Sequence, residues 1–527
     1  MNARTMAIVL AMTVLAAGSH AAPPTLFEST GRLTPEAEID RLVLERLNAL
    51  GIEPARVCSD AVFVRRVYLD TVGLLPSADE ARAFLDDTDP AKRTKLIDRL
   101  LDRKAFADYQ AMHWADILRV KAEFPINLWP NAAACYHRYI RDSIAANKPY
   151  DDFARELVTS SGSNFRVPAV NFYRAVQEND PESLARAAGL AFMGVRADKW
   201  APERLAGFSR FFAYVAYKPT REWKEQIVQF DVIRAARDAA AGNIEPAVLP
   251  DGARVPLDGA TDPRTLFADW LIDAENPYFA RCAVNRTWYW LMGRGIVHEP
   301  DDMRRDNPPS NAKLLDYLAR ELVDSDYDLK HIYRLILNSK TYQLAPVPRS
   351  KHPEAEAQFA YYAPRRLEAE VLIDALCRIT GTTERYDSRI PEPFTFVPET
   401  HRTVALPDGS ITSPFLEMFG RPPRDSGLLS ERNNTMSAAQ RLHLLNSSHI
   451  RKKIERGPAL RPLLRKTWRN PHKSMETLYL TILSRRPTEA ELLAIRQYSR
   501  TGEARGRLAL FDTIWALLNS SEFLYRH

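Results

Sequence analysis

Apolar residues recur three and four positions apart along most of the chain, a spacing that places them on one face of an α-helix. The first such run follows Thr34-Pro35-Glu36, a capping residue, a proline and an acid, and it ends at Gly51. Residues 77–80 have the sequence of a capping box. Further helices are predicted near 104–122, 131–147, 183–194, 263–292, 311–323, 328–338, 365–380, 435–446, 474–484, 488–500 and 505–520.

Period-two alternation, the pattern of a half-buried strand, is rare along the chain. Residues 241–262 are rich in Pro, Gly and Ala, which predicts a linker or a small insert. Residues 383–432 hold many prolines and little periodicity, which indicates a long ordered loop region or a small sheet. The predicted fold is mainly α, with two helical domains over 34–240 and 263–527, a small irregular or β insert and a proline-rich loop region.

The helices nearest the carboxyl end carry apolar residues at helical spacing, so we expect them to bury one face. The residues expected in this core are Tyr479, Leu480, Leu483, Ile514, Leu517, Leu518 and Phe523.

The amino-terminal residues have the pattern of a secretory signal. Arg4 precedes an apolar run over 6–17, and Ser19-His20-Ala21 places small residues before a cleavage point. Residues 1–21 are therefore predicted to be a signal peptide, either removed or retained as an anchor. No later stretch reaches the roughly 18 apolar residues that a spanning helix needs. We expect a periplasmic or secreted protein with no transmembrane segment after cleavage.

Composition narrows the classes of partner. The net charge of +5 is mild for 527 residues, and no basic block is interleaved with aromatic residues, so nucleic acid is not an expected partner. The four cysteines form no Cys-x-x-Cys pair, which argues against a zinc site. Disulfides and free thiols both stay open, although the apolar surroundings of Cys282 and Cys377 favour buried thiols.

Two stretches of the chain resemble consecutive domains of the planctomycete cytochrome-type family. Residues from about 37 to 235 resemble its second domain, and residues from about 262 to 525 resemble the domain of unknown function that usually follows. The first resemblance rests on residues 66–76, 113–116, 147–151 and 194–200. The second rests on residues 276–277, 285–288, 293–295, 307–310, 327–330, 364–367, 419–424, 443–446 and 519–523. The resemblance implies a scaffold and no established reaction.

The chain departs from this family where haem would be attached. The usual Cys-x-x-Cys-His is missing between Gly194 and Trp200, which here are joined by Val-Arg-Ala-Asp-Lys. The family often has Cys-x-Cys-Glu-Arg after its Arg-Pro-Pro-Arg motif, where this chain has Leu428-Leu429-Ser430-Glu431-Arg432. Both changes remove cysteines, so we expect a non-redox protein with no cofactor.

An arginine-rich group in the proline-rich region is the main candidate binding site. It consists of Arg421, Arg424, Glu431 and Arg432. Arginine forks bind carboxylate, sulfate or phosphate through two hydrogen bonds, and loops on a rigid scaffold often carry sites. The alternative is an internal ion-pair network that holds the loop in place.

Two weaker candidates involve other carboxylates. Asp301 and Asp302 follow His298-Glu299-Pro300, an oxygen-rich run that could suit a hard cation, although helix capping and surface solvation explain it as well. His113 and Asp116 stand one helical turn apart, as a general base and its supporting carboxylate would, or as residues at the edge of a core.

Together these patterns predict an exported, non-redox envelope protein that binds a partner protein or an anionic surface polysaccharide. The alternative is a hydrolase or lyase that acts on an anionic or sulfated glycan through the arginine-rich group.

Covalent c-type haem has no attachment chemistry in this sequence, because no Cys-x-x-Cys-His occurs in it. We therefore expect the protein purified from a host that matures c-type cytochromes to show no Soret band in its absorption spectrum. A stoichiometric band would contradict this expectation.

Overall fold

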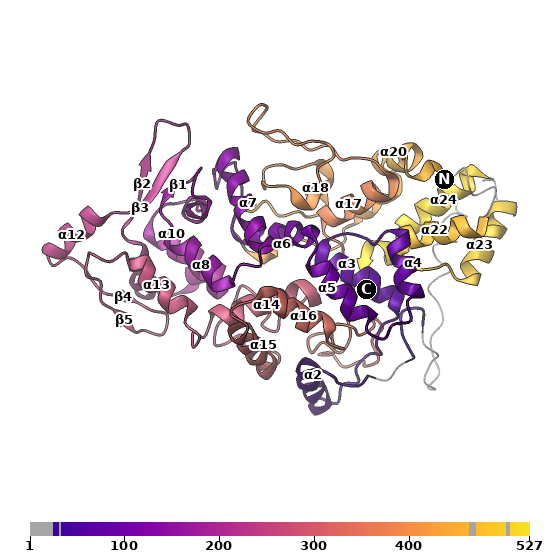
Figure 1. The fold of residues 1–527 in the computed structure, drawn as a ribbon, viewed down its shortest axis with the longest axis horizontal. Helices are drawn as coiled ribbons and strands as arrows, with labels where there is room; N and C mark the ends of the chain where they lie inside the picture. The colour runs from indigo at the N-terminus through magenta and orange to yellow at the C-terminus, as the bar shows by residue number, and fades with distance from the viewer. Residues whose placement is uncertain (1–24, 31–32, 463–470, 502–505) are drawn as a thin grey trace. The chain divides into compact units, whose positions relative to one another are not determined.

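The structure is a computed structural model that describes residues 25–30, 33–462, 471–501 and 506–527. The described chain is mainly helical, as the hydrophobic spacing predicts, and its strands form small sheets (Figure 1). The predicted signal peptide, residues 1–21, lies outside the described residues. Among the described helices, none has the length and apolarity needed to cross a membrane.

Contacts divide the chain into two compact units, each assembled from separate segments. Unit 1 comprises residues 1–99, 338–384 and 434–527, and unit 2 comprises residues 100–337 and 385–433. The sequential domains predicted over 34–240 and 263–527 remain a prediction, because the units group segments by contact and not by order along the chain.

Unit 1 is built mainly from helices around α3 (Asp60–Val72), in which every residue from Val62 to Val72 is buried. Its other helices are α2 (Glu38–Ala49), α4 (Ala78–Asp86), α17 (Ala369–Thr380), α19 (Ala438–Asn446), α20 (Ser448–Arg456), α22 (Pro471–Leu483), α23 (Glu489–Thr501), α24 (Arg507–Leu518) and α25 (Ser521–Leu524). The short strands β6 (Arg365–Arg366) and β7 (Tyr525–Arg526) pair antiparallel. All seven predicted carboxyl-terminal core residues are buried, which confirms that prediction.

Unit 2 contains helices and a small antiparallel sheet in the order β1-β3-β2. Its helices are α6 (Lys104–Ile117), α7 (Pro130–Ala145), α8 (Tyr150–Thr159), α9 (Asn171–Arg174), α10 (Pro181–Ala188), α11 (Pro202–Ser209), α12 (Val232–Ala240), α13 (Pro263–Ile272), α14 (Phe279–Met292), α15 (Ala312–Asp324) and α18 (Pro414–Met418). Its strands are β1 (Gly162–Ser163), β2 (Val215–Pro219), β3 (Gln226–Phe230), β4 (Ala247–Val248) and β5 (Arg254–Val255). Helices α5 (Lys92–Leu101) and α16 (Leu329–Asn338) end next to the points where the chain passes between units.

Several predicted elements change in detail. The helix expected near 263–292 is two helices, because Asn276-Pro277 interrupts it and Asn276 caps the second. The insert over 241–262 contains the β4–β5 hairpin, in agreement with the predicted irregular or β insert. The proline-rich region over 383–432 is a long loop with α18 and single 3-10 turns. The β2–β3 hairpin has no counterpart in the predicted elements.

The centre of unit 1 is a buried carboxylate with four polar partners. Asp70 accepts hydrogen bonds from the hydroxyls of Tyr342 at 2.8 Å and Tyr362 at 2.9 Å. The guanidinium groups of Arg365 and Arg526 each lie 3.0 Å from its other oxygen. The Asp70 side chain is fully buried, so these contacts replace the water that an ionised carboxylate needs.

A buried arginine one turn earlier on α3 completes this cluster. Arg66 donates to the carbonyls of His527 and Leu344 at 2.9 and 2.8 Å. Its guanidinium lies 3.7 Å from the ring centroid of Tyr362, a cation–π contact. Burial raises the pKa of Tyr362 to about 12, so its hydroxyl remains a donor at neutral pH. All three segments of unit 1 therefore meet at α3.

Replacing Asp70 with asparagine should destabilise the fold strongly, because the cluster loses the buried charge that pairs with Arg365 and that balances Arg526 together with Glu368. We expect the free energy of unfolding to fall by about 3–5 kcal/mol, measured by urea denaturation. The matched control is Asp79→Asn, whose side chain is 94% exposed beside Arg82 and should change stability by less than about 0.5 kcal/mol. Equal losses in the two variants would contradict a central role for Asp70.

Candidate functional site

The arginine-rich group predicted as a binding site lies in unit 2, and its arginines contact the protein itself. Arg424 Nε lies 2.8 Å from Asp116 Oδ1, and an Arg432 terminal nitrogen lies 2.7 Å from Asp116 Oδ2. Arg424 is 1% exposed, and its backbone adopts a left-handed φ of 61°. These contacts match the internal ion-pair network that the sequence left as the alternative.

The charge balance of this contact favours an ionised Asp116. Burial alone would raise the pKa of Asp116, but the charges of Arg432 and Arg424 outweigh it and lower that pKa. Because the pKa is lowered in the folded state, the contact stabilises the protein at neutral pH. That stabilisation is lost as the pH falls below the unfolded value of about 3.9.

The other two members of the group are also engaged. Arg421 is 9% exposed and donates to the carbonyl oxygens of Ile411 and, at 3.1 Å, Asp408. The Glu431 carboxylate accepts the backbone N–H groups of Asp425 and Ser426. The four predicted residues therefore do lie in one region, where they hold the 408–432 loop against α6.

The weaker carboxylate candidates occupy different positions. Asp301 is 1% exposed; one oxygen lies 3.0 Å from the Arg286 guanidinium, and the other accepts the Leu429 N–H at 2.6 Å. Asp302 lies 3.2 Å from Arg304. Among the described residues, no group of three or more His, Cys, Asp or Glu side chains is placed to hold a metal.

His113 and Asp116 share α6, but their side chains have different partners. The His113 ring is 4% exposed, and its centroid lies 5.0 Å from that of Trp290 and 4.7 Å from that of Tyr109. Both oxygens of Asp116 bind arginine. The ring contacts of His113 fit the alternative of an aromatic residue within a helical core.

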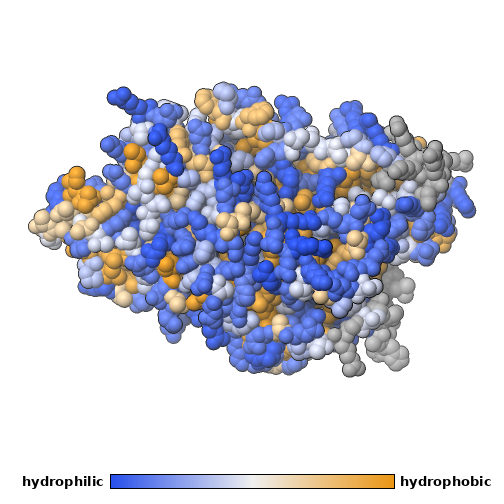
Figure 2. Space-filling model, viewed as in Figure 1, coloured by the Kyte–Doolittle hydropathy of each residue, from blue (hydrophilic) through white to orange (hydrophobic). Residues whose placement is uncertain are grey.

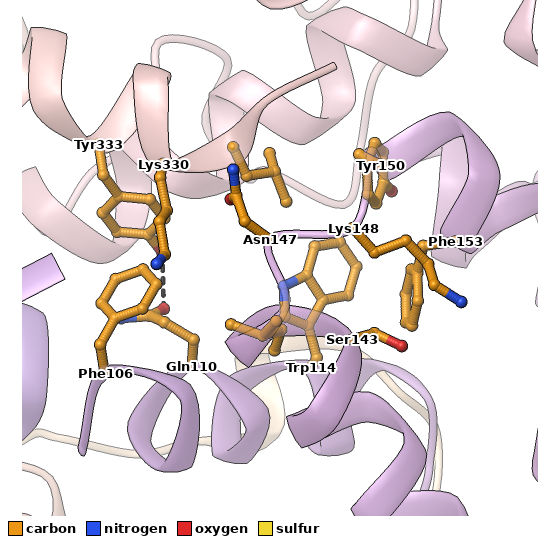
Figure 3. A pocket seen from close by; sticks show the side chains of 12 residues that line it. Phe106, Gln110, Trp114, Ser143, Asn147, Lys148, Tyr150, Phe153, Lys330 and Tyr333 are labelled. Atoms are coloured by element: carbon orange, nitrogen blue, oxygen red, sulfur yellow. Dashed lines mark hydrogen bonds between the residues drawn. The ribbon is translucent and has the colours of Figure 1, made fainter. Parts of the chain in front are cut away.

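A narrow cavity lies between α6, α7, α8 and α16 of unit 2 (Figure 3). Its walls include Phe106, Trp114 and Phe153, and the Tyr333 hydroxyl donates to Gln110 at 2.6 Å along one side. The cavity volume is about 40 Å³, room for about three water molecules. The Lys148 ammonium at its rim binds Glu156 at 2.7 Å. This space suits water or a small group better than a polymer unit.

The most accessible candidate site is an aromatic surface on three loops of unit 2. Among the described residues, every exposed large aromatic side chain belongs to these loops. They are Phe124, Trp223, Phe394 and Phe396, which are 76%, 68%, 57% and 70% exposed. We call this set the aromatic loop surface. Exposed aromatic rings are unfavourable in water, so several together indicate a binding surface.

Contacts between the loops hold this surface together. The Trp129 and Phe394 rings lie 5.4 Å apart, which links the loop before α7 to the proline-rich region. The Arg389 N–H donates to Glu123 at 3.0 Å in the same place. The Lys224 ammonium, next to Trp223 in the β2–β3 hairpin, lies 3.5 Å from Asn127 Oδ1. The hairpin projects from the rest of unit 2 (Figure 1).

The hairpin end of the aromatic loop surface carries more cations than anions, although Glu222 is exposed beside Trp223. Lys218 and Arg221 are exposed near Trp223, and the Lys224 ammonium lies 5.5 Å from the Trp223 ring centroid. Arg166, whose side chain is 84% exposed, lies 3.8 Å from Glu225 at the base of the turn. A flat ring among cations can stack on a sugar face while the cations bind an acidic substituent.

A second exposed apolar area in unit 2 is aliphatic. Hydrophobic side chains lie on the surface over α12 in Figure 2, where Val232 and Ile233 are 51% and 81% exposed. Aliphatic side chains lack the flat ring face, so this area serves as a comparison for the aromatic loop surface.

Family comparisons confirm the resemblance that the motifs carry. A PSCyt2 domain, a protein of unknown function (DUF1549), matches residues 38–198, and it is followed by a PSD1 domain, a protein of unknown function (DUF1553), at residues 263–499. No curated protein and no solved structure matches the chain.

The aromatic loop surface was not among the residues predicted from the sequence. Its signal is visible in hindsight: Trp223 stands in a polar stretch, Thr220-Arg221-Glu222-Trp223-Lys224-Glu225, and Phe394 and Phe396 stand among prolines. An aromatic residue without helical or alternating apolar neighbours has no core face to occupy.

Replacing Arg424 with lysine should lower stability although it keeps the charge, because an ammonium cannot reproduce the guanidinium fork. We expect the free energy of unfolding to fall by about 1.5–3 kcal/mol, measured by urea denaturation. Arg385→Lys is the control, because Arg385 is exposed in the same loop region. Unchanged stability of the Arg424 variant would show that the Asp116 contact is dispensable.

Proposed function

We propose that this protein is an exported, non-redox envelope protein that binds an anionic polysaccharide through the aromatic loop surface. The proposal rests on one observation: the exposed aromatic side chains of the described chain gather on three contacting loops, and one of them stands among exposed cations. The export part rests on the signal pattern of residues 1–21 and the non-redox part on the missing haem motif.

The ligand class follows from the chemistry around Trp223. Its ring can stack on the C–H face of a pyranose, and Lys218, Arg221 and Lys224 can bind carboxylate or sulfate substituents. Glu392 is exposed beside Phe394, so the cationic contacts concentrate at the hairpin end. An extended polymer fits this arrangement, because the loops present an exposed surface.

A hydrolase or lyase acting on such a glycan would need an acid or base free to reach it. Of the carboxylates singled out from the sequence, Asp116 and Asp301 are buried and bound to arginine. Asp302 and Glu431 are half-buried; Asp302 pairs with Arg304, and Glu431 accepts two backbone N–H groups. Binding without turnover is therefore the function that we favour.

The test is a binding screen with alginate, a carboxylated polymer, carrageenan, a sulfated polymer, and a neutral β-glucan, using affinity electrophoresis. We expect an anionic polymer to retard the protein and the neutral one to do so less. Trp223→Ala should weaken binding about tenfold, a loss of about 1.4 kcal/mol, whereas Trp223→Phe should retain most of it.

Two controls separate the parts of this prediction. Ile233→Ala removes an exposed aliphatic side chain of the same unit and should leave binding unchanged. Arg221→Gln should weaken binding at low salt and reduce its salt dependence, because one exposed cation is lost. If no anionic polymer binds the wild-type protein, or if the Trp223 and Ile233 variants lose affinity equally, the proposed function fails.

A further inference from the structure

A cysteine and a lysine lie in direct contact in unit 1, whereas the proposed binding surface belongs to unit 2. Cys377 stands near the end of α17, and Lys453 stands on α20, which packs against α17. The Lys453 ammonium lies 3.3 Å from the Cys377 sulfur, although the two residues are 76 positions apart in the chain. Of the four cysteines, all free thiols, Cys377 is the one with a lysine contact in the structure.

The ammonium is held in place by two further acceptors. It donates to the Thr383 carbonyl at 2.7 Å and lies 2.9 Å from the Glu384 carboxylate. Glu384 in turn lies 3.0 Å from the His449 ring. Lys453 is 6% exposed, so its side chain has little freedom to leave the sulfur.

The two helix ends are also fixed against each other. Gly381 ends α17 with a φ of 70°, and a Cβ there would meet the Ala459 backbone nitrogen at 2.9 Å. The Ala459 N–H donates to the Thr380 carbonyl at 3.1 Å. A side chain at Gly381 would push these segments apart, so their close approach depends on this glycine.

Cys377 is half-buried, so a small oxidant can reach it, whereas Cys282 is fully buried. When a thiol and an amine are held in contact, one oxygen atom can bridge the sulfur and the nitrogen. We propose that Cys377 and Lys453 are a modification site, at which dioxygen converts them into a covalent sulfur–oxygen–nitrogen bridge.

The reaction balances with one molecule of dioxygen. The S–H bond of Cys377, two N–H bonds of the Lys453 ammonium and the O–O bond break, and one S–O and one N–O bond form. The second oxygen atom leaves as water with two of the three released hydrogens. The third hydrogen leaves as a proton, which the neighbouring Glu384 carboxylate can accept. Dioxygen gains four electrons, two from sulfur and two from nitrogen. A thiol reductant that returns four electrons and four protons restores the thiol and the amine.

The bridge would change both charge and connectivity. It removes the cation that pairs with Glu384 and ties α17 to α20 across a long loop, which restricts the unfolded chain. Burial raises the pKa of the Cys377 thiol, an effect that Lys453 partly opposes, so thiolate becomes more abundant as the pH rises. We expect the bridge to form faster at mildly alkaline pH.

Mass spectrometry of the full chain, kept in air or under a thiol reductant, tests the proposal. In air we expect a species that is heavier by one oxygen and lighter by two hydrogens, and a digest in which the Cys377 and Lys453 peptides are joined. Cys377 should resist alkylation in this species, and the reductant should reverse the change. The melting temperature should be several degrees higher in air than under reductant.

Two variants keep the test specific. Cys377→Ser retains a hydrogen-bonding group beside Lys453 but cannot form the bridge, so its melting temperature should be the same in air and under reductant. Cys135→Ser removes another half-buried thiol that has no lysine contact in the structure, and it should behave like wild type. The proposal fails if Cys377 stays open to alkylation in air, if the chain gains oxygen without losing hydrogen, or if a disulfide forms instead.

Discussion

In each compact unit, a buried carboxylate on a helix is held by two arginines from remote parts of the chain. Asp70 on α3 binds Arg365 and Arg526, and Asp116 on α6 binds Arg424 and Arg432. A buried charge that loses its partner is costly, so every segment that supplies a partner is tied to the helix that carries the acid. The discontinuous composition of the units is possible because such contacts join segments far apart in sequence.

Because these arginines contact the protein itself, other side chains of the same region are the ones exposed to a ligand. The guanidinium groups of Arg421 and Arg424 are turned inward, to carbonyl oxygens and to Asp116, so the loop that carries them is held in one conformation. The same proline-rich region carries Phe394 and Phe396 on its exposed side. Within one proline-rich region, the arginines thus form internal contacts and the phenylalanines are exposed, a division of roles that suits the proposed binding surface.

The packing of unit 1 also determines where the proposed modification site lies. The four cysteines of the chain form no Cys-x-x-Cys pair, yet one of them holds its thiol against an amine where two helices of unit 1 meet. The geometry there depends on packing, on Gly381 and on the acceptors around Lys453, none of which is part of a haem motif. The contact between Cys377 and Lys453 is therefore a property of the tertiary structure and not of a short motif.

The sequence by itself determined the helical class and the position of most helices, because the three-and-four spacing of apolar residues is a local property. It also identified the carboxyl-terminal core and the two consecutive family domains. It predicted one helix over 263–292, where the structure has two. It did not reveal the β2–β3 hairpin, since five-residue strands with mixed burial carry a weak alternating signal.

Only the tertiary structure decided what the candidate residues do. His113 and Asp116 are neighbours on one helix, yet Asp116 pairs with Arg424, which is 308 positions away, and His113 packs among aromatic rings. The contact between Cys377 and Lys453 and the grouping of the exposed aromatic residues are likewise absent from any local pattern. Spacing along the chain reports which face a residue occupies, whereas its partner depends on which distant segment folds against that face.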